Sequence, residues 1–487
     1  MFAMLETYGE SDIYPYHMPG HKRHPWGELP QDMYLRDITE IDGFDNLHQP
    51  EGILRSLQEK AAVLYGSEEC YYLVNGSTGG ILSAVSGAVP FGGHILMARN
   101  CHRSAYHAAY LGKLRISYLY PSELTSYGIL DAITPGQVQA ALDQEPGIQA
   151  VLLVSPTYEG RIADIRQIAG IVHRKGIPLI VDEAHGAHLG LAEGFAQNSC
   201  QAGADLVVHS VHKTLPALTQ TALLHVNGPL VDRERVRRFL DIYQSSSPSY
   251  LLMASIDNAL SGVVQQGEKS FADFLGRWKE MGENLKQCRH LKFLPAGISQ
   301  DVGKLLVCGK DIRISGRQFY ETLLARYHLQ MEMATETSVL AMFTVNDTQE
   351  GYRRLTKALL EIDRELESGD LGLDAGSLKE GMPVRQPEAG NLPWEQAQSL
   401  SPGLPLAEAW DMEKCLVPLE ESVGRYAAGF VNLYPPGIPV LVPGETMTHM
   451  LYEKIARWIG MGLTVQGVKG SGTGRYLEVI RTGSLQE

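Results

Sequence analysis

The chain has 487 residues, of which 44% are hydrophobic and 20% are charged. This is the composition of a globular protein with a large core, and it excludes a wholly disordered or collagen-like chain. The net charge of −14, from 42 basic and 56 acidic residues, argues against nucleic acid as a partner, since an acidic protein does not attract phosphate backbones.

The sequence has no feature of a membrane or secreted protein. Its most apolar window, residues 81–98, is interrupted by serines, glycines and a proline, and residues 1–12 have no basic and apolar regions of a secretory signal. The six cysteines contain no CxxC pair, which predicts reduced thiols. We therefore expect a cytoplasmic protein with no membrane partner.

Residues 1–52 are predicted to form an N-terminal arm. They are rich in proline and histidine and show no long helical period, but they contain several aromatic residues, among them Tyr14, Tyr16 and Phe44. Aromatic side chains favour burial. The arm is therefore predicted to lie on another surface, such as a second subunit.

Residues 53–290 are predicted to form a large α/β domain, because short apolar runs alternate there with helical patterns. Strands are predicted at residues 71–74, 94–98, 116–120, 150–155, 178–181, 206–209 and 221–226. Residues 53–64 have apolar residues at helical spacing, and the clearest helix is predicted at residues 164–175. This alternation indicates a mostly parallel, doubly wound sheet, in which ligands bind beyond the carboxyl ends of the strands.

The rest of the chain is predicted to form smaller α+β domains. Residues 291–368 combine two strands, 304–308 and 339–345, with two helices, 318–327 and 350–367. Residues 369–405 are rich in Gly, Pro, Glu and Gln and predict a linker or surface loop, and residues 406–487 a C-terminal domain with a helix at 447–459.

A lysine and an aspartate each follow a predicted strand of the large domain. Lys213 stands beside two imidazoles and a hydroxyl, and neighbouring positive charge and desolvation make a lysine a better nucleophile. Asp182 can accept a hydrogen bond from a protonated pyridine nitrogen, as pyridoxal 5'-phosphate (PLP) requires. An isolated lysine would be an ordinary surface residue and an isolated aspartate a turn cap, but the pair is more specific.

Two further segments complete a candidate PLP site. In Gly76-Ser77-Thr78-Gly79-Gly80, a glycine-rich turn between a strand and a helix predicts a phosphate site, to which Ser210 and His212 can add donors. The turn has no P-loop lysine, so an ATP site is disfavoured. His102 follows the second predicted strand, where it can either stack on the cofactor ring or cap a helix.

A metal site is the alternative. His185 and His188, and likewise His209 and His212, are three residues apart and near Asp182 in sequence, and zinc sites use such ligands. Both pairs follow strands, there is no HExxH motif, and a metal would leave Lys213 and the phosphate turn unexplained. We therefore predict no metal.

These residues together resemble the bacterial ornithine/lysine/arginine decarboxylase family of fold-type-I PLP enzymes. Three more strings support the resemblance: MPGHK at residues 18–22, TEIDGFDNLH at 39–48, and YPPGIP at 434–439 followed by PGE at 443–445. Large members carry an additional N-terminal receiver-like domain that is not seen here, so the resemblance is to the compact branch.

The resemblance implies a role for each matching residue. Lys213 binds the cofactor covalently, Asp182 pairs with the pyridine nitrogen, and His102 stacks on the ring. The residues implied for the rest of the cofactor site are Ser77, Thr78, Gly79, His185, Ser210 and His212. Glu445 is a candidate for binding the distal cation of a basic substrate, across a subunit boundary.

The implied activity is decarboxylation of a basic L-amino acid in polyamine biosynthesis, by a homodimer with its active site near the subunit interface. Conversion of arginine to agmatine is favoured, followed by lysine to cadaverine or ornithine to putrescine. The alternatives are another PLP enzyme on the same scaffold, such as an aminotransferase or aldolase, and a non-catalytic PLP-binding regulator.

Overall fold

The structure is a computed structural model that describes residues 1–24, 28–297, 299–309, 314–368, 403–435, 437–470 and 474–481. Residues 369–402, most of the predicted linker, lie outside the described residues. The chain falls into two compact units. The first comprises Met1–Met97, Thr134–Pro156 and Ala163–Phe271, and the second comprises Ala98–Ile133, Thr157–Ile162 and Ala272–Glu487.

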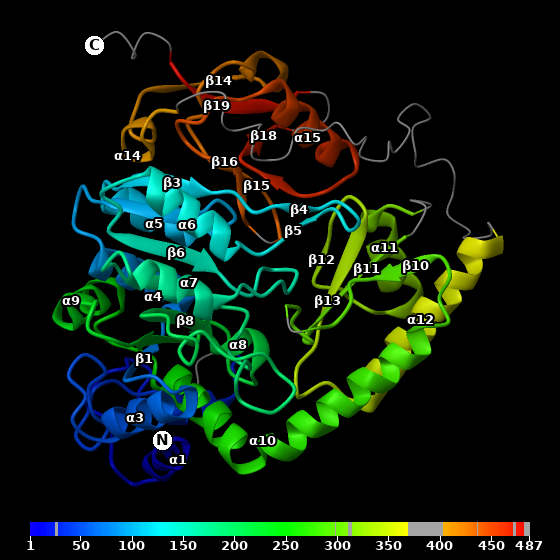
Figure 1. Cartoon of the computed structure of the whole chain (residues 1–487). Coiled ribbons are helices and arrows are strands. Elements are labelled where there is room, and N and C mark those ends of the chain that lie inside the picture. Colours follow the sequence, from blue (N-terminus) through cyan, green and yellow to red (C-terminus); the bar gives the residue numbers. More distant parts are fainter. Residues whose placement is uncertain are drawn as a thin grey trace. The chain divides into compact units, whose positions relative to one another are not determined.

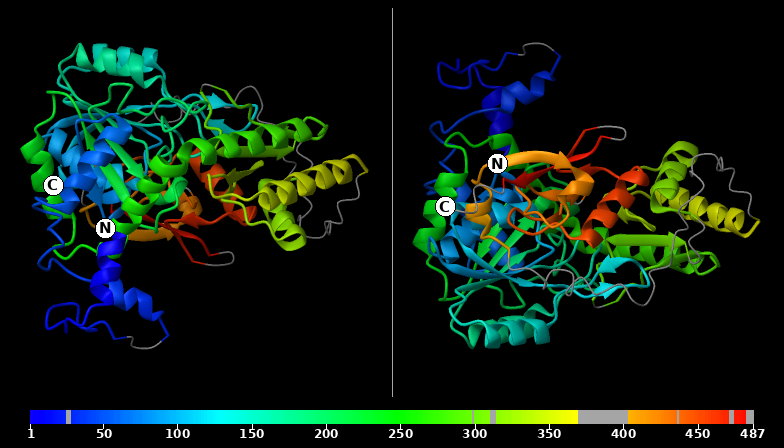
Figure 2. Two further views of the ribbon diagram at one scale, coloured as in Figure 1. Left: turned by 90° about the horizontal axis from the view of Figure 1, so that it is seen from below. Right: turned by 90° about the horizontal axis from the view of Figure 1, so that it is seen from above.

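The arm of the first unit contains two short helices, α1 (Phe2–Gly9) and α2 (Gln31–Arg36), which the sequence did not predict. Both views of Figure 2 show the arm, in dark blue, standing off from the sheet of its own unit. Phe44 is buried against Tyr250 with the ring centroids 6.3 Å apart. Tyr14 and Tyr16 instead remain 58% and 89% exposed.

The first unit is built on a sheet whose strands follow the order β1-β9-β8-β7-β6-β2. These strands are β1 (Glu69–Leu73), β2 (His94–Ala98), β6 (Ala150–Val154), β7 (Leu179–Asp182), β8 (Leu206–Ser210) and β9 (Ala222–Val226). Strands β2, β6, β7 and β8 are parallel. Strand β9 is antiparallel to both β8 and β1, because residues 211–221 are too few for a crossover helix. The predicted mostly parallel sheet is confirmed.

Helices cover this sheet directly or pack against a helix that does (Figure 1). They are α3 (Ile53–Tyr65), α4 (Gly76–Ala88), α6 (Pro135–Gln144), α7 (Ile165–His173), the single turn α8 (Val211–Thr214) and α9 (Arg233–Tyr243). Asp164 caps α7 through the backbone N–H of Gln167, and Thr134 forms a capping box with Gln137 at α6.

Gly80 lets α4 lie close to the sheet. A Cβ atom at this position would stand 2.7 Å from Leu73 Cδ1 and 2.9 Å from Val208 Cγ1. Both neighbours are fully buried strand residues, so neither can move away freely. Gly80, the last residue of the GSTGG turn, therefore has a packing role in addition to any role at the phosphate.

The substitution Gly80→Ala is expected to destabilise the protein by about 1–3 kcal/mol, because it overpacks the helix–sheet interface. The free energy of unfolding in urea measures this effect. Gly136→Ala in α6 is the matched control, since a Cβ atom there meets nothing within 4 Å. Equal unfolding midpoints for the two variants would contradict the packing argument.

The second unit contains a small α+β sheet in the order β10-β11-β13-β12. Its elements are β10 (Leu291–Phe293), β11 (Lys304–Gly309), α11 (Gly316–Tyr327), β12 (Met333–Ala334), β13 (Ser338–Met342) and α12 (Gln349–Ser368). The long helix α10 (Tyr250–Leu285) starts in the first unit and ends in the second. The unit also includes α5 (Arg103–Leu111), β3 (Arg115–Leu119), β4 (Glu123–Leu124) and β5 (Ile129–Leu130).

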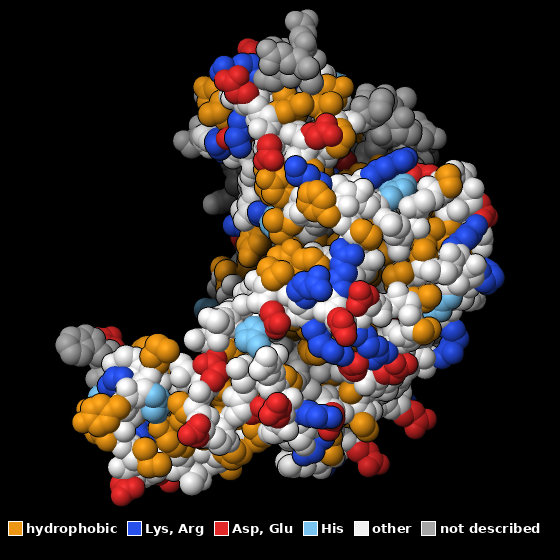
Figure 3. Space-filling model, turned by 90° about the vertical axis from the view of Figure 1, so that its left-hand side faces the viewer, with side chains coloured by type: hydrophobic (Ala, Val, Ile, Leu, Met, Phe, Trp, Pro, Cys, Tyr) orange, Lys and Arg blue, Asp and Glu red, His pale blue; other side chains and the backbone are white. Residues whose placement is uncertain are grey.

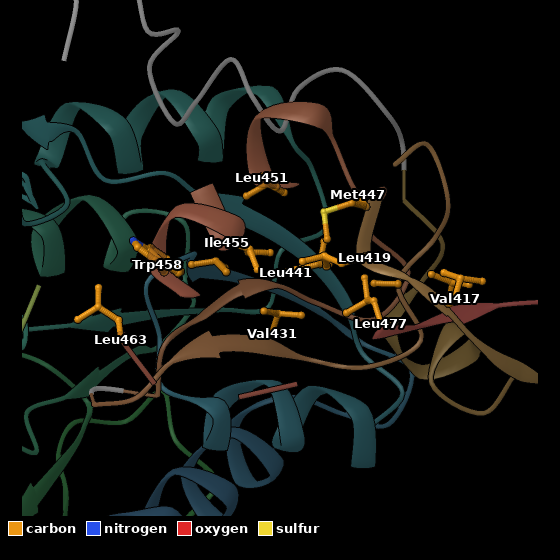
Figure 4. Close-up of a cluster of buried hydrophobic side chains, with 13 residues drawn as sticks. Val417, Leu419, Val431, Leu441, Met447, Leu451, Ile455, Trp458, Leu463 and Leu477 are labelled. Atoms are coloured by element: carbon orange, nitrogen blue, oxygen red, sulfur yellow. The ribbon is translucent and has the colours of Figure 1, made fainter. Parts of the chain in front are cut away.

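The C-terminal part of the second unit has a core of its own. Two three-stranded sheets, β14-β19-β18 and β16-β15-β17, carry helix α15 (His449–Gly460). The strands are β14 (Lys414–Pro418), β15 (Val431–Leu433), β16 (Pro439–Leu441), β17 (Val465–Gln466), β18 (Val468–Lys469) and β19 (Tyr476–Ile480); α14 (Leu406–Ala409) and a 3-10 turn (Leu419–Ser422) complete the part. In Figure 4 the α15 side chains Leu451, Ile455 and Trp458 lie over Val431 and Leu441.

One face of the protein is mixed in charge despite the net charge of −14 (Figure 3). Figure 3 shows acidic and basic side chains interspersed on one face. Among the described residues, no helix is both long and apolar enough to cross a membrane.

Candidate active site

The sheet of the first unit brings the predicted strand-end residues to one edge. Asp182 is the last residue of β7 and pairs in register with Val208 of β8. Ser210, the last residue of β8, pairs with Ala222, which pairs in turn with Leu73 at the end of β1. The turns that leave β1, β7 and β8 therefore start from the same edge, where doubly wound sheets bind ligands.

Lys213 lies in the short helix that begins directly after β8. Its Nζ atom is 3.2 Å from Nε2 of His185, which is buried in the loop after β7. Asp182 is also buried; burial raises the pKa of its carboxyl, and the charge of Lys213 and the backbone N–H of Ala184 partly offset this rise. The three residues Asp182, His185 and Lys213 thus form one electrostatic site.

The predicted phosphate residues lie on two segments that are tied together. Helix α4 begins at Gly76, whose positive φ of 67° turns the chain out of β1 and whose N–H donates to the Gln220 carbonyl. His212 Nδ1 donates to the carbonyl of Thr221, the next residue. The N–H groups of Ser77 and Thr78 are in the first turn of α4, where they have no acceptor within the helix and the helix dipole favours an anion.

The side chains of Ser210 and His212 differ in what they can donate to a phosphate at this site. Ser210 Oγ is buried and has no hydrogen-bond partner among the described residues, so a bound phosphate oxygen would satisfy it. Because the Nδ1–H of His212 donates to the Thr221 carbonyl, this ring can donate to a phosphate through Nε2 only as a cation. Burial, together with the charge of Lys213, lowers the pKa of His212. The cationic ring that could donate to a phosphate therefore depends on the negative charge of the bound anion.

His102 lies in the second unit, where it caps helix α5. Its Nδ1 accepts from the Ser104 N–H at 3.3 Å and lies 3.0 Å from Ser104 Oγ. A Cβ atom at Gly437 would be 3.9 Å from His102 Nε2, so Gly437 packs beside this ring. Capping is therefore observed, and stacking on a cofactor remains a prediction.

Glu445 binds a cation of its own chain. Its carboxylate accepts from Arg99 Nε at 3.1 Å and Nη2 at 2.8 Å, and from the Val442 N–H at 2.9 Å. Arg99 is fully buried; burial alone would lower its pKa, but the Glu445 charge raises it above its ordinary value. The binding of a substrate cation by Glu445 stays a prediction, and the structure gives this carboxylate an internal role.

The histidine pairs of the metal alternative do not act as pairs. His209 Nε2 lies 2.7 Å from Glu183 Oε2 and its Nδ1 lies 3.1 Å from His225 Nε2, whereas His212 bonds to the Thr221 carbonyl. Sequence reasoning missed Glu183 and His225 as partners of His209. The adjacent acidic pair Asp182-Glu183 was the available signal, since a second carboxyl beside a strand end needs buried partners.

The chemistry of this edge fits PLP. A lysine near a carboxylate, a buried imidazole against the lysine, and an unsatisfied hydroxyl near an open helix N-terminus match the aldehyde, the pyridine nitrogen and the phosphate. Such a site at the end of a mostly parallel sheet defines the fold-type-I PLP enzymes.

Comparison with known proteins places the chain within this class. The model of the Orn/Lys/Arg decarboxylase major domain matches residues 1–319, and that of the C-terminal domain of the same decarboxylases matches residues 395–478. The chain belongs to the Orn/Lys/Arg decarboxylase family and is a decarboxylase.

Relatives and solved structures agree along most of the chain. The uncharacterized protein YaaO of Bacillus subtilis is 34% identical over 96% of this chain and 95% of its own length. The arginine decarboxylase of Bacillus subtilis is 29% identical over 99% and 97%. The lysine decarboxylase of Francisella novicida has the same fold, with a TM-score of 0.82 at 18% identity over 98% of this chain and 80% of its own.

Proposed function

We propose that this protein decarboxylates a basic L-amino acid with PLP, and that arginine, converted to agmatine, is the preferred substrate. The observation that carries the proposal is the site formed by Lys213, His185 and Asp182 at the strand ends. The choice of arginine is supported by relatives named arginine decarboxylase that align over nearly the whole chain. Lysine and ornithine are the next candidates, and polyamine synthesis is the proposed pathway.

PLP supplies an electron sink for the electrons of the broken Cα–carboxylate bond. The chain's own residues bind and orient the cofactor. Lys213 would hold it covalently, and Asp182 would accept a hydrogen bond from its ring nitrogen. Ser77, Thr78, Gly79, Ser210 and His212 bind its phosphate.

His185 and Lys213 are the proposed proton carriers. Their nitrogen atoms are 3.2 Å apart, which is hydrogen-bond distance once one of them is deprotonated. With its amine free of the cofactor, Lys213 would share a proton with the His185 imidazole between Nζ and Nε2. Either nitrogen would be the donor of the proton that the substrate carbon needs once CO2 has left.

An amine-product assay tests the substrate. Purified enzyme supplied with PLP receives arginine, lysine and ornithine at equal concentration, and CO2, agmatine, cadaverine and putrescine are measured. Agmatine is expected to dominate. Transfer of the amino group to 2-oxo acids without CO2 would instead favour an aminotransferase, and PLP uptake without any product would favour a regulator.

Asp182→Asn is expected to lower kcat at least about a hundredfold, because a neutral amide does not stabilise a proton on the pyridine nitrogen. Steady-state decarboxylation measures this effect. Asp143→Asn is the control, since Asp143 is an exposed carboxylate paired with Lys175 on the surface. A D182N enzyme with wild-type kcat would refute the assigned role.

We also propose a homodimer, as the exposed aromatic residues of the arm suggest. The rings of Tyr14 and Tyr16 contact each other at a tilt of 49° with centroids 4.8 Å apart, yet both are mostly exposed, and exposed aromatic clusters mark interaction surfaces. Light scattering after gel filtration is expected to give twice the chain mass. A monomer at micromolar concentration would contradict the proposal.

A further inference from the structure

A chain of hydrogen bonds runs through the core of the first unit. It starts at Glu183, whose Oε2 lies 2.7 Å from Nε2 of His209. Nδ1 of His209 lies 3.1 Å from Nε2 of His225, and Nδ1 of His225 lies 2.9 Å from Oγ of Ser67. Each imidazole thus uses both of its ring nitrogens.

The chain leads from the fully buried interior toward the surface. Glu183 is 1% exposed, and His209 and His225 are 0% exposed, whereas Ser67, in the loop before β1, is only partly buried. The chain therefore connects a carboxyl without solvent access to a hydroxyl near the surface.

The chain adjoins the candidate cofactor site in sequence. Glu183 follows Asp182 directly, and His209 precedes Ser210 directly. Successive side chains of a strand point to opposite faces, so the Glu183–His209 contact joins the ends of β7 and β8 on the face away from Asp182 and Ser210. A change of charge on Glu183 would act one residue from Asp182.

The donors and acceptors of the chain allow two arrangements. With a proton on Glu183, its carboxyl donates to His209 Nε2, His209 Nδ1–H donates to His225 Nε2, and His225 Nδ1–H donates to Ser67 Oγ. With Glu183 ionised, each bond reverses: His209 Nε2–H donates to Glu183, His225 Nε2–H donates to His209 Nδ1, and Ser67 O–H donates to His225 Nδ1. The two arrangements differ by one proton, and both imidazoles are neutral in each.

The surroundings favour a neutral chain. Ser199 donates to Glu183 through N–H and O–H, and these bonds, with the charge of His188, favour the ionised carboxylate. Burial favours the protonated carboxyl more strongly, and no Lys or Arg of the described residues forms an ion pair with Glu183. The ring of Tyr65 lies 4.7 and 4.9 Å from those of His209 and His225, and Cys200 is buried nearby.

We propose that Glu183, His209, His225 and Ser67 form a proton-conducting chain that loads and unloads the buried carboxyl of Glu183 and so positions the charge of Asp182. The proton leaves Glu183 for His209 as His209 passes its Nδ1 proton to His225, His225 passes its own to Ser67, and Ser67 releases one to solvent. Glu183 and His209 are positioning residues, and their action on the cofactor rests on the proposed function.

The first test needs no cofactor. Burial raises the pKa of Glu183 to about 8, and it lowers that of His209 to about 3. In full-length protein with 15N-labelled histidine, both imidazoles are expected to carry the proton on Nδ1 well below pH 8 and on Nε2 well above it, without becoming cationic. Histidines that keep one tautomer across this range, or that become cations, would overturn the proposal.

Two variants sharpen this test. Glu183→Gln keeps a donor toward His209 and an acceptor for Ser199, so both imidazoles should stay in the Nδ1–H form at every pH. Infrared spectra should also show that this variant loses the band of a protonated carboxyl that disappears in the wild type as the pH rises through about 8. Glu159→Gln is the control, because Glu159 is another carboxyl with a raised pKa but accepts from Thr157 and has no described hydrogen bond to a histidine.

The second test uses the holoenzyme. The absorbance of the Lys213-bound cofactor should change with pH near the value at which the histidines change tautomer, and Glu183→Gln should abolish this change. If the tautomers switch but the absorbance does not, the influence on Asp182 is refuted. If no absorbance band of a Lys213-bound cofactor appears at all, the proposed function fails. The histidine signals still report on the hydrogen-bond chain in that case.

Discussion

Lys213→Ala is expected to abolish decarboxylation, with a fall in kcat of about a thousandfold or more. Alanine has no amine to bind the cofactor aldehyde. Loss of the lysine also removes the Nζ atom that lies 3.2 Å from His185 Nε2. The protein should still fold, because Lys213 is only partly buried in a single helical turn. Steady-state kinetics measure the first effect and circular dichroism the second.

Covalent trapping makes this prediction specific. Borohydride reduction of the wild-type holoenzyme, followed by peptide mapping, should place the pyridoxyl group on Lys213. Lys175→Ala is the matched control, since the Lys175 ammonium forms an exposed ion pair with Asp143 at 2.8 Å. A pyridoxyl group on another lysine, or full activity of the K213A enzyme, would refute the proposed function.

Glu445→Gln is expected to destabilise the protein by about 3–5 kcal/mol, because it leaves a buried guanidinium without its counter-charge. Arg99 is fully buried, and the Tyr106 hydroxyl and the Pro439 carbonyl, which also accept hydrogen bonds from it, carry no charge. Urea unfolding monitored by fluorescence measures the loss.

A double-mutant cycle separates the ion pair from general damage. Replacing Arg99 by Met together with Glu445→Gln should recover part of the lost stability, since no unpaired charge is then buried. Glu59→Gln is the control, because Glu59 and Arg55 form a pair that is 65% exposed on each side and should contribute less than about 1 kcal/mol. Equal losses for E445Q and E59Q would contradict the prediction.

The same ion pair explains why the role of Glu445 was hard to predict. In the sequence, PGE is a motif far from Arg99, and nothing local shows that the two meet. The contact spans 346 residues and forms only after β16 brings Pro439 beside the loop that follows β2. Long-range pairs of this kind depend on tertiary packing and leave no periodic signal.

Short elements were likewise beyond sequence reasoning. Strands β12, β17 and β18 have two residues each, which is too few to establish an alternating pattern. The arm helices α1 and α2 have eight and six residues and are marginal without packing. The longer elements were found within a few residues of their ends, as β2 and α3 show, because their apolar periods are complete.

What the residues alone revealed was the chemistry at the strand ends: Asp182, Lys213 and the glycine-rich turn follow apolar runs, and any parallel sheet brings such positions together. The tertiary structure decided how the buried polar groups around these residues are paired. Glu183 binds His209 and Ser199, His209 binds His225, and the Nδ1–H of His212 donates a hydrogen bond to a backbone carbonyl. The physical reason is that a buried polar group must be satisfied by whichever partner the fold places beside it, and that partner is set by strand order and register, not by neighbours in sequence.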